Sequence, residues 1–521
     1  MRLPPAQLPL RNACGIKSVN SIMQSIFIDK ISRACLVVFS LVMAFATFAC
    51  FYFSLSQLKN VGFTLPAPAA VAGILAVTML LAVASFRTRI AAVFQRIEHI
   101  PHLFGIALIL GVAIRVGWWW LTLPEMQVSD GAAYLKLAAK LYRGEDYLLD
   151  GHAFWAPGTP LIYAAFMLVL GLHGWLALAV NLIAFVLCGI AVRAIFARLE
   201  MPSSFAGLSV ALLALWPELF ITAGQVSKET LLLSLLSGGF ALLLSRSGWS
   251  SFAAGLLFGL AALTAPALLF GALVFGFGVV AMGYPSRQTF LCVFAMLIGT
   301  ALVIAPWTYR NYRILGAPVP VSTNFGVTLH AANQPAVVRP MTDVGDYIAP
   351  PEPNPPFSDE VAASRWHAAE GFKFIKEDPG DFLVLVAHRL TAIMGDDSDS
   401  AFRSLRSTQK TSGGAYLAAK ALCNSYWVIL TALLTVFCWN FRDPESLHRA
   451  APVIVVATLA TLYAMGVFGV VEGGARHHMG WSWIYSVLLI LAVQRSTESA
   501  SNKVPASTKM RFGLSEIWLR G

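Results

Sequence analysis

A single acidic residue, Asp130, follows a strongly apolar stretch at the point where the chain is expected to leave a membrane. The sequence around it, SDGAAYLKLAAKLYRG, predicts a short amphipathic helix lying flat on the bilayer, with Lys136 and Lys140 on one face and Leu137 on another. Ser129 or Asp130 could cap the free N–H groups of this helix. Asp130 could equally act as a general base within reach of a lipid substrate. The spacing alone leaves both interpretations open.

Basic residues predicted on the same side of the membrane could bind a phosphate. Arg310 and Arg313, in APWTYRNYRILG, are spaced i, i+3 and share one helical face. They could be snorkelling anchors, but the positive-inside rule gives no reason for arginines outside, and guanidinium groups grip phosphate in bidentate fashion. Lys228 and Glu229 open a later apolar helix, where the carboxylate either complements the helix dipole or serves as a second acidic group of the site.

Two further charged positions complete the candidate set. Arg115 lies inside an apolar span, where a charge costs about 2.5–3.5 kcal/mol on insertion scales. It should therefore face protein or water, paired with a carboxylate or with a substrate phosphate. Glu472, Arg476, His477 and His478 cluster between the last two spans. Adjacent histidines point about 100° apart on a helix, so we do not expect both to bind one metal, and Arg476 is the better candidate for a phosphate or sugar contact.

The composition defines the environment of these residues. Of the 521 residues, 57% are hydrophobic and 12% are charged, whereas a soluble protein carries about twice that charged fraction. Runs of roughly 17–25 apolar residues recur, each long enough to cross a bilayer as a helix. The net charge of +10 fits Lys and Arg at cytoplasmic helix ends. No basic patch is interleaved with exposed aromatics, so nucleic acid is not an expected partner.

The apolar runs predict an all-α polytopic membrane protein. The apolar segment 159–175 is interrupted by Gly171 and Gly174. Arg87, before this segment, and Arg193, after it, both lie on the inner side only if the segment does not cross the membrane. We therefore expect about twelve spans with both termini cytoplasmic, and a helix at 159–175 that dips into the outer leaflet. The candidate spans are about 34–54, 63–86, 103–123, 177–197, 204–221, 229–245, 250–266, 267–283, 289–306, 416–439, 451–470 and 479–494.

This topology divides the chain into consecutive segments. Within the second outer segment a surface helix is expected from Asp359 to Glu377, ended by Pro379 and Gly380. Its apolar face is predicted to contain Trp366, Ala369, Phe372 and Ile375. The segments are a cytoplasmic N-terminus with two extra helices (1–102), a catalytic membrane module (103–306) with a first extracytoplasmic loop (124–176), an extracytoplasmic segment (307–415), C-terminal transmembrane helices (416–495) and a cytoplasmic tail (496–521).

Taken in order, these pieces resemble the membrane-embedded, polyprenyl-phosphate-dependent glycosyltransferases of the GT-C type. That group includes protein O-mannosyltransferases, lipid A aminoarabinose transferases and lipopolysaccharide galacturonic-acid transferases. The resemblance covers residues 103–495. The motifs that carry it are the helix of Arg115, SDGAAYLKLAAKLYRG, APGTPLIYAAFMLVLG, WPELFITAGQVSKETLL, GLLFGLAALTAP, APWTYRNYRILGAPVPVSTNFGVTLHAANQP and GGARHHMGWSWIYSVLL.

The resemblance implies a GT-C-like bundle of about twelve transmembrane helices in the bacterial inner membrane, with juxtamembrane helices in the outer loops. Asp130 takes the position of the family's first-loop catalytic aspartate, and 159–175 becomes one of the juxtamembrane helices. Two positions depart from the family pattern. Many relatives carry an acidic pair in the first loop, whereas Ser129 precedes the aspartate here, and the C-terminal Arg-Tyr pattern reads Arg476-His477.

The chemistry implied by this family suits the residues present. A lipid phosphate leaves as an anion and needs cations rather than an acid, whereas a glycosidase needs two carboxylates. We expect Asp130 to take the acceptor proton, with inversion at the anomeric carbon. The phosphate would be held by Arg310 and Arg313, with Lys228 or Arg476 in addition.

The expected ligands follow from this scheme. Asn311 and Asn324 could contact sugar hydroxyls, although capping of turns explains them equally well. The donor is a lipid-phosphate sugar, the acceptor an envelope glycolipid, glycan or protein, and membrane lipids surround both. No Cys/His metal spacing is present, so no metal ligands are predicted, while assistance by a divalent metal stays open. The alternatives are a flippase or transporter for lipid-linked oligosaccharides, which predicts paired intramembrane charges, and a non-catalytic envelope-assembly protein.

Overall fold

The computed structural model describes residues 19–58, 63–124, 127–283, 286–338, 348–352, 357, 359–406, 413–439, 441 and 444–501. These residues form helices and connecting turns, with no strand among them. The beginning of the predicted N-terminal segment and most of the predicted tail lie outside the described residues. The prediction of an all-α protein is confirmed.

Seven helices of the described chain are long and apolar enough to cross a membrane by themselves. They are α1 (Val19–Ser56), α2 (Pro68–Ser85), α4 (Leu103–Thr122), α7 (Leu176–Arg198), α13 (Ser286–Leu315), α19 (Gly413–Cys438) and α20 (Pro444–Val471). An eighth candidate is the pair of α8 (Ser203–Leu215) with α9 (Pro217–Ile221) and η2 (Thr222–Gly224), which is bent by 64°. The bend falls where Pro217 removes a backbone donor from the helix.

Four further units complete the bundle. They are α10 (Lys228–Leu243), α11 (Gly248–Thr264), η3 with α12 (Pro266–Leu268 and Gly271–Ala281) and α21 (Ser482–Ser501). Each of the twelve predicted spans therefore falls on a helix, although length and composition alone qualify seven of them, or eight with the bent pair.

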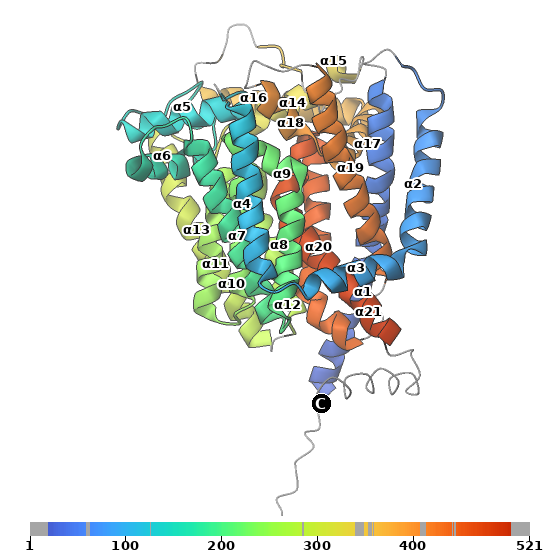
Figure 1. Cartoon of the computed structure of the whole chain (residues 1–521). Coiled ribbons are helices and arrows are strands. Elements are labelled where there is room, and N and C mark those ends of the chain that lie inside the picture. The colour runs from blue at the N-terminus through green and yellow to red at the C-terminus, as the bar shows by residue number, and fades with distance from the viewer. Residues whose placement is uncertain are drawn as a thin grey trace, which may run out of the picture.

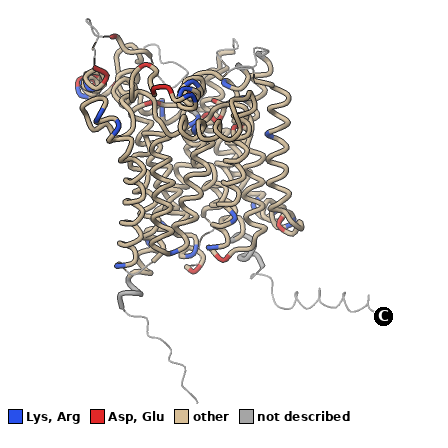
Figure 2. Tube along the Cα trace, turned by 90° about the vertical axis from the view of Figure 1, so that its left-hand side faces the viewer, with Lys and Arg blue, Asp and Glu red and all other residues tan. Residues whose placement is uncertain are grey.

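The remaining helices lie at the two ends of the bundle or between its longer members. They are α3 (Arg87–Glu98), α5 (Asp130–Tyr142), α6 (Gly158–Leu170), α14 (Phe325–Ala332), α15 (Pro335–Val338), α16 (Glu360–Glu377), α17 (Pro379–Gly395), α18 (Asp399–Arg406) and η4 (Ala475–Trp481). In Figure 1, α5, α6, α14 and α16 gather at one end, and α3 lies at the other. Figure 2 shows Lys, Arg, Asp and Glu concentrated at these two ends, with few in the band between them. This distribution is that of a multi-pass membrane protein.

Helix α6 is a short apolar helix that packs against α5 at one end of the bundle (Figure 1). It contains 13 residues, so at about 1.5 Å per residue it is about 20 Å long, shorter than a hydrocarbon core of about 30 Å. Gly171 ends it with φ of 77°, a left-handed conformation that glycine adopts without a steric penalty.

Helices α11 and α13 pack through glycines that face each other's backbone. A methyl group on Gly255 would overlap the carbonyl oxygen of Met296, and one on Gly299 would overlap that of Phe252. Small residues of this kind let two membrane helices approach closely. This contact holds the middle of α13, the helix that carries Arg310 near its C-terminal end.

The segment 307–415 contains one helix that was not predicted and one that begins as predicted. Helix α17 was not predicted, because Asp381, His388 and Arg389 interrupt its apolar pattern. It packs against α1 and α20, and its last turn is buried. Helix α16 begins as predicted, with the Asp359 carboxylate accepting hydrogen bonds from the N–H groups of the first turn.

The predicted apolar face of α16 is wrong. The structure buries Val361, His367, Gly371 and Phe374, whereas Phe372 is 48% exposed. The face is selected by the close approach of Gly371 to Leu329 of α14, a tertiary contact that hydrophobic periodicity does not contain.

Candidate functional site

Asp130 is the first residue of α5, and its carboxylate faces a cation. Ser129, which precedes it, has φ of 55° and ψ of −142° and makes no side-chain capping hydrogen bond. This backbone conformation is costly for a residue with a Cβ, and such strain is concentrated at functional sites. The Oδ2 atom of Asp130 lies 3.0 Å from Nη1 of Arg476. The structure thus pairs Asp130 with a residue far away in the sequence.

Arg476 is surrounded by three carboxylates. Besides Asp130, its Nε lies 3.8 Å from Oε1 of Glu229 and its Nη2 lies 3.7 Å from Oε1 of Glu472. The Arg476 side chain is 13% exposed and that of Glu229 is 5% exposed. Glu229 also accepts a hydrogen bond from the hydroxyl of Ser227, the residue that caps α10. Asp130, Glu229 and Arg476, predicted separately, are therefore brought together.

Two more cations act on this cluster. Lys228 forms no ion pair with any side chain that the structure describes, and Arg403 of α18 pairs with Asp399. Burial by itself would raise the pKa of Asp130, but the charges of Arg476, Lys228 and Arg403, with the hydrogen bond from Arg476, hold that pKa well below its usual range. The Asp130 carboxylate is therefore ionised.

Arg403 was missed in the sequence analysis. It lies in DDSDSAFRSLR, within a segment treated as an extracytoplasmic insertion. The signal available was the run of acidic residues followed by an arginine four positions after Asp399, the spacing of a helical ion pair.

The two histidines after Arg476 point in different directions, as predicted from their adjacency. His477 stacks on Phe468 with ring centroids 3.6 Å apart, whereas His478 lies 2.8 Å from the carboxyl group of Asp397. Among the described residues, no group of three or more His, Cys, Asp or Glu side chains is arranged to hold a metal ion.

Arg310 holds the loop between α5 and α6. Its Nη1 donates to the carbonyl oxygen of His152 at 2.7 Å and its Nη2 to that of Tyr147 at 3.4 Å, while its guanidinium lies over the Trp307 ring. Glu360 holds the other side of the same peptide segment, accepting from the N–H of His152 at 2.6 Å. The Arg310 guanidinium is therefore occupied by backbone carbonyl oxygens of the loop between α5 and α6.

The other predicted ligands near Arg310 have structural contacts. Arg313 is exposed and donates to the hydroxyl of Tyr309 at 3.2 Å. Asn311 is fully buried and donates to the carbonyl oxygen of Val319 at 2.9 Å. Asn324 precedes α14 and accepts from the Ser322 hydroxyl at 2.7 Å. None of these contacts, as described, joins Arg310, Arg313, Asn311 or Asn324 to Asp130.

Arg115 faces protein, as predicted, but its described contacts are not carboxylates. It donates to the carbonyl oxygens of Gly111 at 3.0 Å and Leu213 at 3.3 Å, and its guanidinium lies 3.8 Å from the centre of the Phe185 ring. Carbonyl oxygens and an aromatic face are ways to accommodate a charge inside a bundle.

Fold and site together define a polytopic helical membrane protein with a charged cluster at one end of its bundle. No family model and no curated protein matches the chain. The structure is similar to the apo oligosaccharyltransferase of Archaeoglobus fulgidus, with a TM-score of 0.44 and 13% identity over 79% of this chain and 52% of that one.

Two complexes with lipid phosphates are also similar. For AglB from Archaeoglobus fulgidus with an inhibitory peptide and a dolichol-phosphate, the TM-score is 0.42 at 12% identity, covering 80% of this chain and 53% of that one. For ArnT from Cupriavidus metallidurans bound to undecaprenyl phosphate, the TM-score is 0.32 at 15% identity, covering 75% and 79%. This chain spans about half the length of the archaeal proteins.

Proposed function

We propose that this protein is a GT-C-type glycosyltransferase that moves a sugar from a polyprenyl phosphate to an envelope acceptor at the extracytoplasmic face of the bacterial inner membrane. The observation that carries the proposal is the pairing of Asp130 with Arg476 beside Lys228 and Arg403. A base and several cations at one end of a membrane bundle are the groups that such a transfer requires.

In the proposed reaction, an acceptor hydroxyl oxygen attacks the anomeric carbon of the lipid-linked sugar. The bond from that carbon to the phosphate oxygen breaks, and its electron pair leaves with the polyprenyl phosphate. The acceptor proton passes to Asp130, and the configuration at the anomeric carbon inverts. Because the leaving phosphate is already an anion, cations that stabilise its charge replace a general acid.

The phosphate in this scheme is held by Lys228, Arg476 and Arg403. Lys228 has a free ammonium group, as far as the described side chains show, and Arg476 has more carboxylates around it than one guanidinium can neutralise. An incoming phosphate competes with these carboxylates for Arg476. As Arg476 turns towards the phosphate, Asp130 loses its strongest partner and becomes a better base.

The flippase alternative receives no support from the described spans. It requires charged pairs along the membrane interior, and Arg115 is held there by carbonyl oxygens and a ring.

The deciding experiment uses purified full-length protein in nanodiscs with a panel of polyprenyl-phosphate sugars and extracted envelope acceptors. Mass spectrometry should detect free polyprenyl phosphate together with a sugar-modified acceptor. Asp130→Asn should abolish the sugar transfer. Asp146→Asn, which replaces an exposed acid of the same loop, should leave the transfer unchanged. Full transfer by Asp130→Asn contradicts the base assignment, and movement of lipid-linked sugar without release favours a flippase.

A further inference from the structure

The 3-10 helix η4, which presents Arg476 to Asp130, is anchored by the histidine two residues further on. The His478 ring is 1% exposed and stacks on Trp427 with centroids 4.3 Å apart and planes 16° from parallel. On the other side of η4, His477 stacks on Phe468. The backbone that carries Arg476 is thus held from two directions.

Both ring nitrogens of His478 are bonded. Nδ1 lies 2.9 Å from the carbonyl oxygen of Ile393, and Nε2 lies 2.8 Å from Oδ1 of Asp397. A carbonyl oxygen only accepts, so Nδ1 carries the proton. Burial lowers the pKa of His478 to about 4 and raises the pKa of Asp397 well above its usual range. With Nδ1–H facing Ile393, the 2.8 Å contact between Nε2 and Oδ1 holds a proton that His478 and Asp397 share.

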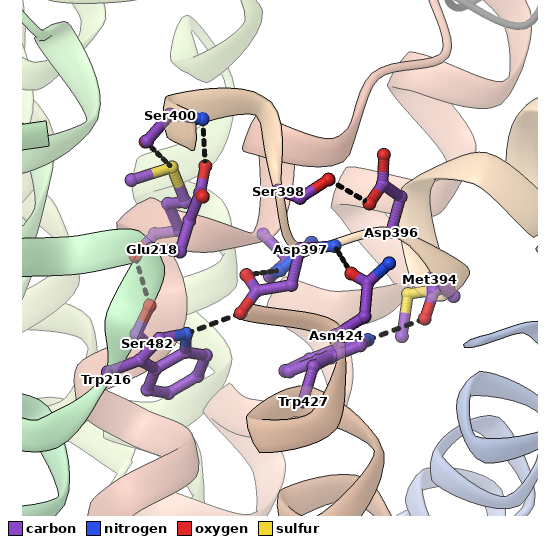
Figure 3. Close-up of polar contacts among 12 residues, drawn as sticks. Trp216, Glu218, Met394, Asp396, Asp397, Ser398, Ser400, Asn424, Trp427 and Ser482 are labelled. Atoms are coloured by element: carbon purple, nitrogen blue, oxygen red, sulfur yellow. Dashed lines mark hydrogen bonds and ion pairs between the residues drawn. The ribbon is translucent and has the colours of Figure 1, made fainter. Parts of the chain in front are cut away.

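Asp397 in turn is hydrogen-bonded to Trp216 and Asn424, which lie on other elements of the bundle. Its Oδ2 accepts from Nε1 of Trp216 at 2.8 Å, and its backbone N–H donates to Oδ1 of Asn424 at 2.8 Å (Figure 3). The side-chain amide of Asn424 reaches the hydroxyl of Ser54 in α1 at 3.4 Å. A fully buried, satisfied network of this kind specifies one arrangement, because each unmade hydrogen bond is costly.

We propose that Asp397 and His478 are positioning residues, which hold η4 so that the Arg476 guanidinium faces Asp130 and the donor phosphate. Neither residue contacts Asp130 among the described contacts, so each acts through Arg476. The inference rests on the proposed function, because it takes the donor phosphate to be a ligand of Arg476.

The first test compares Asp397→Ala with Asp397→Asn. Alanine should raise the donor KM about tenfold, equivalent to 1.4 kcal/mol of donor binding, with a smaller change in kcat. Asparagine should recover most of that affinity, because its amide donates to Nε2 while its oxygen accepts from Trp216. Ser209→Ala, which removes the buried 2.8 Å hydrogen bond to Ser486 elsewhere in the bundle, should leave the donor KM unchanged. A fall in kcat alone, equal for both Asp397 variants, overturns the proposal.

The second test is a double-mutant cycle on donor KM with His478→Phe and Arg476→Gln. Phenylalanine keeps the stacking on Trp427 and removes both nitrogens, so it is informative even where Asp397→Ala does not fold. If His478 acts through Arg476, His478→Phe should change the donor KM less than twofold in the Arg476→Gln background. Additive effects overturn the positioning role. Wild-type protein that neither binds polyprenyl phosphate nor releases it refutes the proposed function instead.

Discussion

The guanidinium of Arg476 lies 3.0 Å from the carboxylate of Asp130. This ion pair joins η4 to α5, two elements far apart in the sequence. Glu229 and Glu472 face the same guanidinium. One arginine therefore serves three carboxylates. Under the proposed function, a donor phosphate that binds Arg476 would release Asp130 from this ion pair.

The pH dependence of transfer should reflect this ion pair. The pKa of Asp130 is held below its usual range, against the effect of burial, by Arg476, Lys228 and Arg403. The acid limb of kcat/KM should therefore lie below pH ~4, the usual value for an aspartate. In Arg476→Gln, burial dominates, and the limb should move to higher pH. A pH–rate profile that is the same in both proteins contradicts the assignment of Asp130 as the base.

The same pair should contribute to stability with a defined sign. Because the folded-state pKa of Asp130 is depressed, its contribution is present above the unfolded-state value of about 3.9 and is lost as the pH falls through the folded-state value. The difference in Tm between wild type and Asp130→Asn should therefore shrink on acidification. A difference that grows on acidification contradicts this linkage.

Lys228 and Arg403 should contribute to donor binding. Replacing either with Gln removes one charge that faces the site, and we expect the donor KM to rise about tenfold for the loss of one charge-assisted contact of about 1.5–3 kcal/mol. Lys136→Gln removes an exposed charge from the outer face of α5 and is the matched control. Equal effects of all three variants would indicate general attraction of an anionic lipid instead of a defined site.

Arg310 and Arg313 should separate into different roles. Arg310→Gln removes donors to the carbonyl oxygens of Tyr147 and His152, so it should cost about 1–3 kcal/mol of stability and expose the loop between α5 and α6 to protease. Arg313→Gln should leave the Tm unchanged, because its side chain is exposed. Measurements of Tm, protease sensitivity and donor KM for both variants distinguish a structural role from phosphate binding. An equal rise in donor KM without loss of stability would support the shared phosphate site predicted from their spacing.

The contact between α11 and α13 should be sensitive to a single methyl group. In Gly255→Ala the new Cβ overlaps the carbonyl oxygen of Met296, and overpacking of this kind costs about 1–3 kcal/mol. Gly117→Ala places a methyl group where no atom lies within 4 Å and serves as the control. Thermal unfolding in detergent should show a lower Tm for the first variant alone. An unchanged Tm would mean that the two helices can separate without loss of stability.

Part of the candidate site could be predicted from sequence because its residues break local rules. Asp130, Glu229 and Arg476 are charged residues in or beside apolar helices, where a charge is expensive. Arg403 and Asp397 could not be found in this way, because they lie in a polar segment where charges are ordinary. Their burial follows from α17, which carries that segment into the bundle.

The sequence by itself determined the membrane class, the positions of the twelve apolar helices and the identity of Asp130 as a chemically informative residue. Apolar runs and charge asymmetry are local properties, and the bilayer converts them directly into spans and ends. Only the tertiary structure decided which cation meets Asp130. The spacing of Arg310 and Arg313 favoured them as phosphate ligands, but their contacts lie with the loop and Tyr309, whereas Arg476 reaches the carboxylate. That choice depends on how α5, α10 and η4 pack against one another, which no local pattern encodes.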